Sequence, residues 1–370
     1  MHRLATTLLL AAGIALTACA PPEPVKIGYV STLSGRSADL GMSGRNGTLL
    51  AIEEINAAGG IHGQLVQLLV RDDTLDPENA RRAIEELAAE KVAAIIGPMM
   101  SHMAFIMAPV ATRLQVVLAS PTATADELVG RDDYLFRFSS PTSAHAKLDA
   151  SFQYHAQGRR RIAVAYEITN KTYTEGYLKE FRQVFTVAGG EMAAIAAFDS
   201  SKNPDYARII RELLDSRPDA LLFICNAVDT VTLAQHTRRE TATMPMIGVA
   251  WAGTEEFIEL GGKAIEGMHV GQYFNRDDQT ASYLAFKEKY QQRFQELPGF
   301  GSAAAYDATR TVLDALQRKA SNQALKDALL TLGPFTGVQR SIVFDAYGDA
   351  ERPSSVTLVR DHRLVHVPWP

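Results

Sequence analysis

IIGPMMSHMAFIMAPVATRLQVVLASPTATADEL, residues 95–128, is the stretch that decides the fold of this 370-residue chain. It predicts, in order, a strand, a helix, a second strand and a hydroxyl-rich loop: residues 95–97, a helix that begins near Ser101, residues 116–119 and residues 120–124. Two strand ends, one helix start and several hydroxyls should then meet at one edge of a sheet. Ligands bind at that edge of an open α/β sheet, because crevices form outside the carboxyl ends of the strands and helix amino termini offer unpaired N–H groups.

Upstream of this stretch, the chain alternates between strand-like and helix-like runs. Apolar runs at residues 25–30, 66–70 and 92–96 predict strands, and apolar residues at helical spacing lie between them. Asp76 and Pro77 provide a side-chain cap and a first-turn proline for the second of these helices. The order strand, helix, strand, helix, strand predicts a parallel sheet with helices on both faces.

A second unit of the same kind follows. Its predicted elements are a strand, a helix, a strand, a helix and a strand: residues 162–166, 174–187, 192–198, 206–213 and 220–225. Asn203 and Pro204 are expected to cap the second helix, as Asp76 and Pro77 cap its counterpart. The repetition predicts two α/β lobes of like topology, with one large domain as the alternative. Two lobes leave a cleft between them, and such a cleft is the default ligand site.

The expected domain plan divides the chain at three crossings. Lobe 1 comprises residues 25–139 and 275–335, and lobe 2 comprises residues 140–274 and 336–370. Extended segments near residues 136–141, 271–275 and 333–338 would join the lobes. Three such crossings let two lobes close as rigid bodies about a hinge. The expected fold class is therefore α/β, with two Rossmann-like lobes joined by three hinge crossovers.

Residues 1–18 predict an export signal. Their uncharged apolar run is too short to span a membrane, because a spanning helix needs about 20 apolar residues. Residues 16–19, LTAC, resemble the lipobox of bacterial lipoproteins, in which the peptidase cuts before the cysteine and the cysteine is acylated. We therefore expect Cys19 to carry a lipid anchor and residues 19–24 to form a tether at the outer side of a bacterial membrane. An ordinary signal peptide with an incidental cysteine is the alternative.

Composition narrows the classes of protein that the mature chain can belong to. Removing residues 1–18 deletes Arg3 and moves the formal net charge from −5 to −6. Mild acidity without a long basic run gives no reason to expect nucleic acid as a partner. Only Cys225 remains beside Cys19, so no intrachain disulfide is expected. Stability must come from a large apolar core, which 46% hydrophobic residues can supply.

Several stretches together resemble a known family. They are GRNGTLLAIEEINAAGGIHGQLVQLLVRDD (residues 44–73), IIGPMMS (95–101), ASPTATADEL (119–128) and FDAYGD (344–349). These stretches resemble the type I periplasmic solute-binding proteins of the leucine/isoleucine/valine-binding kind, in the same order and over nearly all of the mature chain. The resemblance implies two Rossmann-like lobes, no catalysis, and delivery of a captured small molecule to the permease subunits of an ABC importer. It does not specify the ligand.

The resemblance also implies which residues hold the ligand. Ser101 corresponds to the family's carboxylate-binding serine, and Thr122, Ala123 and Thr124 to its second hydroxyl-and-amide loop. Tyr173 corresponds to the aromatic residue that closes over the ligand from the second lobe. Ser101 can cap its helix while its hydroxyl and the free amides bind a carboxylate, and such charged hydrogen bonds are worth about 1.5 to 3 kcal/mol each. A plain helix cap and a capped turn are the structural alternatives for the serine and the threonines.

One departure from the family pattern concerns the ligand's charge. Amino-acid receptors of this family pair the ligand's ammonium group with an acid in the loop that here reads AWAG, residues 250–253. An unpaired buried ammonium group costs several kcal/mol, so an amino-acid ligand would need another acid. Glu167 and Asp229 are the candidates, and a solvated loop charge is the alternative for each. Trp251 instead predicts an aromatic wall, which suits a flat or apolar ligand.

Motifs of catalysis and metal binding are not found. The sequence contains no HExxH, GxSxG, Walker A or GxGxxG pattern, and we expect no cofactor and no metal. Two further functions stay open: a sensor of the same fold that reports ligand to a signalling partner, and an exported α/β enzyme, which the missing catalytic motifs disfavour.

Overall fold

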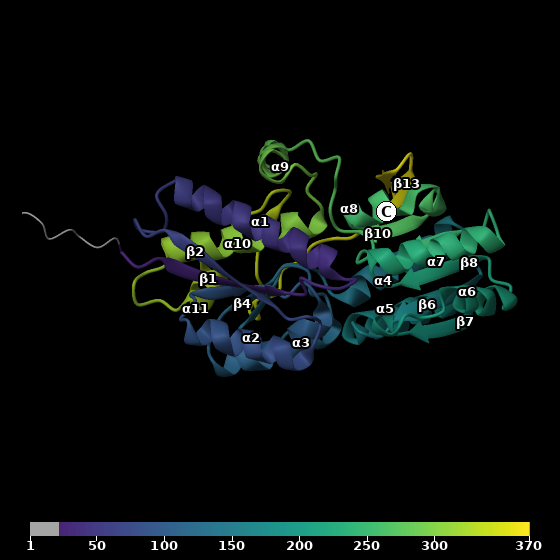
Figure 1. Cartoon of the computed structure of the whole chain (residues 1–370), viewed down its shortest axis with the longest axis horizontal. Coiled ribbons are helices and arrows are strands. Elements are labelled where there is room, and N and C mark those ends of the chain that lie inside the picture. Colours follow the sequence, from purple (N-terminus) through teal and green to yellow (C-terminus); the bar gives the residue numbers. More distant parts are fainter. Residues whose placement is uncertain (1–21, 370) are drawn as a thin grey trace, which may run out of the picture.

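The structure is a computed structural model that describes residues 22–369. The predicted signal peptide and Cys19 lie outside the described residues. Two α/β lobes lie side by side along the long axis of the molecule (Figure 1). Within residues 22–369, no helix is long and apolar enough to cross a membrane.

The first lobe is built on a parallel sheet of five strands in the order β2-β1-β3-β4-β5. The strands are β1 (Val25–Ser31), β2 (Val66–Asp72), β3 (Ala94–Ile96), β4 (Leu118–Ser120) and β5 (Leu135–Arg137). One face is covered by α2 (Pro77–Ala89) and α3 (Ser101–Arg113). The other is covered by α1 (Ala38–Ala57), α10 (Phe300–Arg318) and α11 (Leu325–Thr331), with α9 (Ala281–Phe294) beside α1. Helices on both faces explain why the strands read as continuous apolar runs.

The second lobe is built on a seven-stranded sheet in the order β14-β13-β10-β9-β8-β6-β7, in which β13 runs antiparallel to β10 and β14. The strands are β6 (Arg161–Glu167), β7 (Glu191–Phe198), β8 (Ala220–Ile224), β9 (Met246–Gly248), β10 (His269–Gln272), β13 (Ser355–Arg360) and β14 (Arg363–Val367). Its covering helices are α4 (Thr142–Ser151) and α5 (Lys171–Val187) on one face, and α6 (Tyr206–Asp215), α7 (Ala227–Glu240) and α8 (Glu255–Gly261) on the other. The two sheets confirm the predicted fold class.

Short elements complete the chain between these layers. They are η1 (Asp126–Leu128), η2 (Phe152–Ala156), η3 (Ser200–Lys202), η4 (Gly262–Ile265), β11 (Phe335–Thr336) and β12 (Ser341–Ile342). The last two strands pair with each other rather than with either large sheet.

Of the two predicted helix caps, one is confirmed and one is wrong. The Asp76 side chain accepts hydrogen bonds from the N–H groups of Glu78 and Asn79, each at 2.9 Å, at the start of α2. The predicted counterpart, Asn203, instead adopts a left-handed conformation with φ 46°, and Asp205 caps α6. Asn203 therefore turns the chain two residues before the cap, and the sequence pattern did not distinguish this turn from capping.

The third crossing lies later in the chain than predicted. Phe335, Phe344 and Ala350 belong to the apolar cluster of the first lobe, where Phe344 contacts Phe138 edge to face at 5.1 Å between ring centroids. The assignment of residues 336–370 to lobe 2 is therefore wrong up to Ala350, and only the hairpin of β13 and β14 joins the second sheet. An apolar residue such as Phe344 can enter the core of either lobe, and the sequence does not show which.

Buried polar contacts connect the segments that cross between the two lobes. The Arg352 guanidinium lies 2.8 Å from the Asp307 carboxylate of α10, and both side chains are buried. The main-chain N–H of Arg352 donates to the Ser140 hydroxyl at 2.8 Å, which ties the third crossing to the first. The hinge is therefore anchored on the first lobe.

Candidate ligand-binding site

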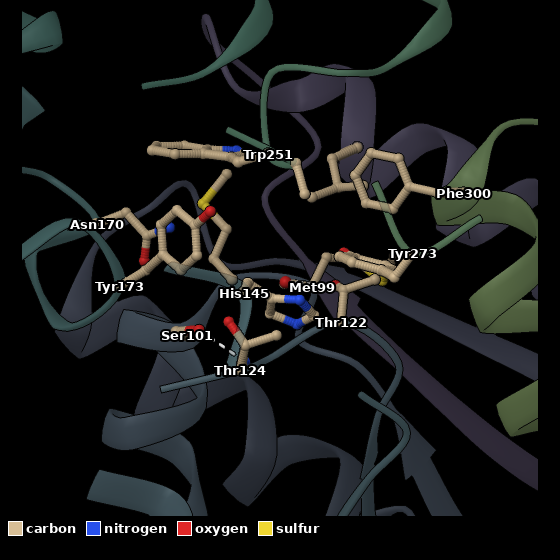
Figure 2. Close-up of a pocket in the computed structure, with 13 residues that line it drawn as sticks. Met99, Ser101, Thr122, Thr124, His145, Asn170, Tyr173, Trp251, Tyr273 and Phe300 are labelled. Atoms are coloured by element: carbon tan, nitrogen blue, oxygen red, sulfur yellow. Dashed lines mark hydrogen bonds between the residues drawn. The ribbon is translucent and has the colours of Figure 1, made fainter. Parts of the chain in front are cut away.

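One pocket lies where the carboxyl edges of the two sheets face each other (Figure 2). Its lining residues are Leu40, Met99, Met100, Ser101, Thr122, Thr124, His145, Asn170, Tyr173, Ala250, Trp251, Tyr273 and Phe300. The cavity between them has a volume of ≈ 20 Å³. A volume that small holds about one water, so the two lobes are closed on each other.

Polar contacts across the cleft hold the lobes in this arrangement. The Asn170 side chain, from the second lobe, accepts a hydrogen bond of 3.0 Å from the N–H of His102 in the first turn of α3. The His102 ring and the Thr172 hydroxyl share a second hydrogen bond of 2.8 Å. Further along the cleft, the Arg36 guanidinium lies 3.1 Å from the buried Asp229 carboxylate. Asn170 thus satisfies a helix N–H that has no partner within its own helix.

Ser101 has a different local role from the predicted helix cap. Met100 occupies the cap position of α3 and Ser101 is the first helical residue, so its hydroxyl does not cap. The Ser101 oxygen instead accepts hydrogen bonds from the N–H groups of Thr124 at 3.0 Å and Ala125 at 3.3 Å. Because both lone pairs are engaged, the hydroxyl can only donate to a further partner. Ser101 thereby joins the two loops that follow β3 and β4.

The threonine loop is held by its own hydroxyls. The Thr122 hydroxyl donates to the Met99 carbonyl at 2.5 Å, and the hydroxyls of Thr124 and Thr142 lie 2.8 Å apart. Ala123 is fully buried in the core and is not among the residues that line the pocket. The loop therefore presents one threonine on each side of a buried alanine.

An aromatic wall forms the second-lobe side. Tyr173 lies in the first turn of α5, and Trp251 follows β9. Both rings lie at the pocket in Figure 2. Their rings stand at 88° to each other with 6.0 Å between centroids, and the two residues are 7% and 6% exposed. This geometry is the edge-to-face arrangement that aromatic pairs prefer. The structure brings Tyr173 and Trp251 together in the lining of the pocket.

Neither predicted acid lines the pocket, and neither is a solvated loop charge. Glu167 is fully buried and accepts hydrogen bonds from the N–H groups of Thr169 at 2.6 Å and Asn170 at 3.1 Å. Burial raises the pKa of this carboxyl above its usual value. Asp229 is also fully buried, and its carboxylate accepts from Asn226, Tyr206 and Ser200 as well as Arg36. Both acids hold the second lobe's loops in place.

Among the lining residues that sequence reasoning missed, two form side-chain hydrogen bonds: Asn170 and His145. Asn170 lies three residues before Tyr173, so its closeness in sequence to a predicted ligand residue was a signal that could have found it. His145 lies in α4 after the first crossing, and no pattern in the sequence marks it.

His145 connects the three crossings at the pocket wall. Its Nε2–H donates to the Ser140 carbonyl at 3.2 Å, so Nδ1 accepts from the Ser354 hydroxyl, and its ring packs 5.3 Å from that of Tyr273. Burial lowers the pKa of this imidazole to about 4. His145 is therefore neutral, with both ring nitrogens engaged, and carries no charge into the pocket.

The pocket has no charged lining residue. None of its lining residues is Asp, Glu, Lys or Arg. Within residues 22–369, no group of three or more His, Cys, Asp or Glu side chains is placed to hold a metal ion. The arrangement can donate hydrogen bonds to a polar head and pack rings against the rest of a small molecule.

The fold and the pocket define a two-lobe α/β binding protein that holds a small molecule between its lobes. The family model described as "Periplasmic binding protein" matches residues 24–363, and the chain belongs to that family. A relative from Pseudomonas aeruginosa, a leucine-, isoleucine-, valine-, threonine- and alanine-binding protein, is 23% identical over 88% of this chain and 87% of its own length.

Solved structures share the fold. The substrate-binding protein LivJ of a branched-chain amino acid transporter from Streptococcus pneumoniae, in complex with isoleucine, has a TM-score of 0.86 at 24% identity, over 93% of this chain and 99% of that one. A solute-binding protein of an ABC transporter from R. palustris, in complex with benzoate, has a TM-score of 0.84 at 17% identity, over 93% and 95%. These relatives are transport binding proteins, and one fold serves both amino-acid and aromatic-acid ligands.

Proposed function

We propose that this protein is an extracytoplasmic solute-binding lipoprotein of an ABC importer that captures a small organic acid without an ammonium group. The lobes close on the acid, with its carboxylate against Ser101 and the Thr122 to Thr124 loop, and its body against Tyr173 and Trp251. Cys19 carries the lipid anchor, and the permease subunits of the importer receive the ligand.

The observation that carries this proposal is the state of the Ser101 hydroxyl. Its oxygen already accepts two main-chain N–H groups, so its hydrogen is free to donate into the pocket. A donor polarised in this way suits a carboxylate oxygen, since hydrogen bonds to charged acceptors are shorter and stronger than neutral ones. Ser101 also lies at the first turn of α3, where the helix dipole favours negative charge.

The uncharged lining argues against an ammonium group on the ligand. An amino acid would bury its ammonium beside aromatic and apolar side chains with no carboxylate in contact. Burying a charge without a partner costs several kcal/mol. An aliphatic or aromatic acid avoids this cost, because the first lobe binds its only charge.

The residues at the pocket fit binding of a ligand without a chemical reaction. His145 is the one imidazole in the lining, and moving a proton at either nitrogen would break its bond to Ser140 or Ser354. Cys225 is fully buried behind the pocket, and burial raises the pKa of its thiol well above the usual value. We therefore propose a receptor rather than an enzyme.

The decisive test compares leucine with 4-methylpentanoate, which has the same skeleton without the ammonium group. Isothermal titration calorimetry should show that 4-methylpentanoate binds at least roughly tenfold more tightly than leucine, since about 1.4 kcal/mol corresponds to a factor of ten. Benzoate is the aromatic probe for the same site. Tighter binding of leucine than of 4-methylpentanoate would contradict the ligand class, and turnover of any bound acid would contradict the receptor.

A further inference from the structure

Trp251 is fixed across the pocket from the residues that would hold the carboxylate. Figure 2 shows Trp251 on one side of the pocket and Ser101 and Thr124 on the opposite side. The turn that carries Trp251 is closed by main-chain hydrogen bonds: the N–H of Ala252 donates to Val249 at 3.0 Å, and that of Gly253 to Ala250 at 3.1 Å. The indole therefore has a defined position relative to the far end of a bound acid.

The indole N–H is a buried donor without an acceptor. Trp251 is 6% exposed, and within residues 22–369 its Nε1 has no hydrogen-bond partner. Buried Trp N–H groups usually find a partner, because leaving such a donor unpaired costs as much as losing a hydrogen bond. An unpaired donor in a pocket wall indicates an acceptor that arrives with the ligand.

The surrounding side chains supply no such acceptor. Tyr173 meets the indole edge to face, which holds the indole plane but offers only a weak π contact. Within residues 22–369, no side chain accepts a hydrogen bond from the indole N–H. A water bound to the indole of the unliganded protein would leave when the ligand enters, and a ligand that cannot replace its hydrogen bond loses affinity.

We propose that the Trp251 N–H is a specificity-determining donor, which selects acids that carry a second hydrogen-bond acceptor at the end remote from the carboxylate. The ligand class is an aliphatic or aromatic acid with a distal carbonyl, hydroxyl or carboxylate oxygen. The inference rests on the proposed function, because it concerns the same pocket and assumes that the carboxylate binds on the first lobe. An N–H donor at this position repels an ammonium group and forms a hydrogen bond with an oxygen of the ligand.

Two matched pairs of probes test the distal acceptor. They are 4-acetylbenzoate with 4-isopropylbenzoate, and 4-oxopentanoate with 4-methylpentanoate; each pair exchanges one carbonyl oxygen for a methyl group. Calorimetry on the wild-type protein should show that the ketone of at least one pair binds roughly 2- to 10-fold more tightly than its hydrocarbon partner, the range expected for one neutral hydrogen bond. This comparison does not depend on the folding of any variant.

Trp251→Phe then removes the N–H while keeping an aromatic ring at the wall. The ketone preference should disappear: in the variant both members of a pair should bind with equal affinity, and that shared affinity reports the change in wall packing. Trp369→Phe is the matched control, because Trp369 is the other tryptophan, packs on Phe152 at 5.6 Å between centroids, and is not among the lining residues. This control should keep the ketone preference.

The outcomes separate this inference from the proposed function. Equal affinity within both pairs, or a ketone preference that survives in Trp251→Phe, overturns the role of the indole and leaves the acid receptor standing. Failure of the wild-type protein to bind any of the four acids overturns the proposed function, and the inference with it.

Discussion

The first-lobe and second-lobe sides of the pocket differ in how their polar groups are engaged. On the first-lobe side, Ser101, Thr122 and Thr124 all form hydrogen bonds with neighbouring loops. On the second-lobe side, the Trp251 N–H has no partner in the described part of the chain. The first side is ordered before a ligand arrives, whereas the second is completed by the ligand.

This difference suggests that the two lobes have different tasks. The first-lobe side binds the carboxylate, and the second-lobe side recognises the rest of the ligand. A side with fixed donors binds any carboxylate, since its geometry is independent of the ligand's body. The second lobe does contain acids, but Glu167, Asp229 and Asp149 are buried and hydrogen-bonded, and none of them lines the pocket. The contrast predicts that neutralising a buried acid changes stability, whereas changing the first-lobe hydroxyls changes binding.

Asp149→Asn should give the largest change, and it should act on stability alone. Asp149 of α4 accepts a hydrogen bond from the Tyr177 hydroxyl, and burial raises the pKa of the carboxyl to about 7. Between its unfolded and folded pKa values, the folded state holds more protons, so wild-type stability falls as pH rises through that window. Asparagine resembles the protonated acid, and the variant's advantage in unfolding free energy should grow towards roughly 4 kcal/mol at about pH 8.

Chemical denaturation at about pH 4 and about pH 8 measures this effect. Glu127→Gln, at an exposed acid of η1, is the matched control and should show no growing advantage. If Asp149→Asn instead weakened binding of leucine, the acid would act on an ammonium group and the contrast between the two sides would be broken.

Ser101→Ala should give the next largest change, and it should act on binding. The variant loses the hydrogen bond to the carboxylate, worth about 1.5 to 3 kcal/mol, or roughly 10- to 150-fold in affinity for 4-methylpentanoate. It also leaves the N–H groups of Thr124 and Ala125 without their acceptor, so the unliganded protein should lose about 1 to 3 kcal/mol of stability.

Thr124→Val separates these two effects. It removes the hydroxyl that bonds to Thr142 but leaves the Thr124 N–H donating to Ser101. Calorimetry should show a smaller loss of affinity than for Ser101→Ala. Equal losses in the two variants would show that loop order, rather than the Ser101 hydroxyl itself, determines binding.

The fold could be predicted from the sequence because the spacing of apolar residues and the order of strands and helices along the chain determine it. Residues 25–30 and 92–96 lie between helices on both faces of the sheet. They are therefore continuous apolar runs, and their burial could be predicted from their composition. The position of the third crossing could not be predicted, because Phe344 is apolar in either lobe and only packing on Phe138 decides which core it enters.

For the candidate site, the sequence predicted residues that the structure places together but not their hydrogen bonds. Ser101, Tyr173 and Trp251 line one pocket, yet the Ser101 hydroxyl bonds to a loop 23 residues away in sequence rather than capping its helix. The sequence predicts Glu167 as a partner for the ligand, with a solvated loop charge as the alternative, and the buried side chain is neither. A carboxylate at a strand end gives no sign that nearby main-chain N–H groups will bind it. Contacts between distant segments are set by the fold, which local pattern does not encode.

Asn170→Ala should give the smallest change and tests the connection between the two sides. The Asn170 oxygen accepts the His102 N–H across the cleft, and this bond exists only when the lobes are closed. Its loss should weaken 4-methylpentanoate binding by about 0.5 to 1.5 kcal/mol while leaving the unliganded melting temperature nearly unchanged. Hydrogen exchange at the His102 amide of the ligand-saturated protein should become faster. Thr186→Ala, near the other end of α5, is the control and should alter neither quantity. Unchanged affinity and unchanged exchange in Asn170→Ala would mean that the aromatic wall and the ligand close the lobes without this hydrogen bond.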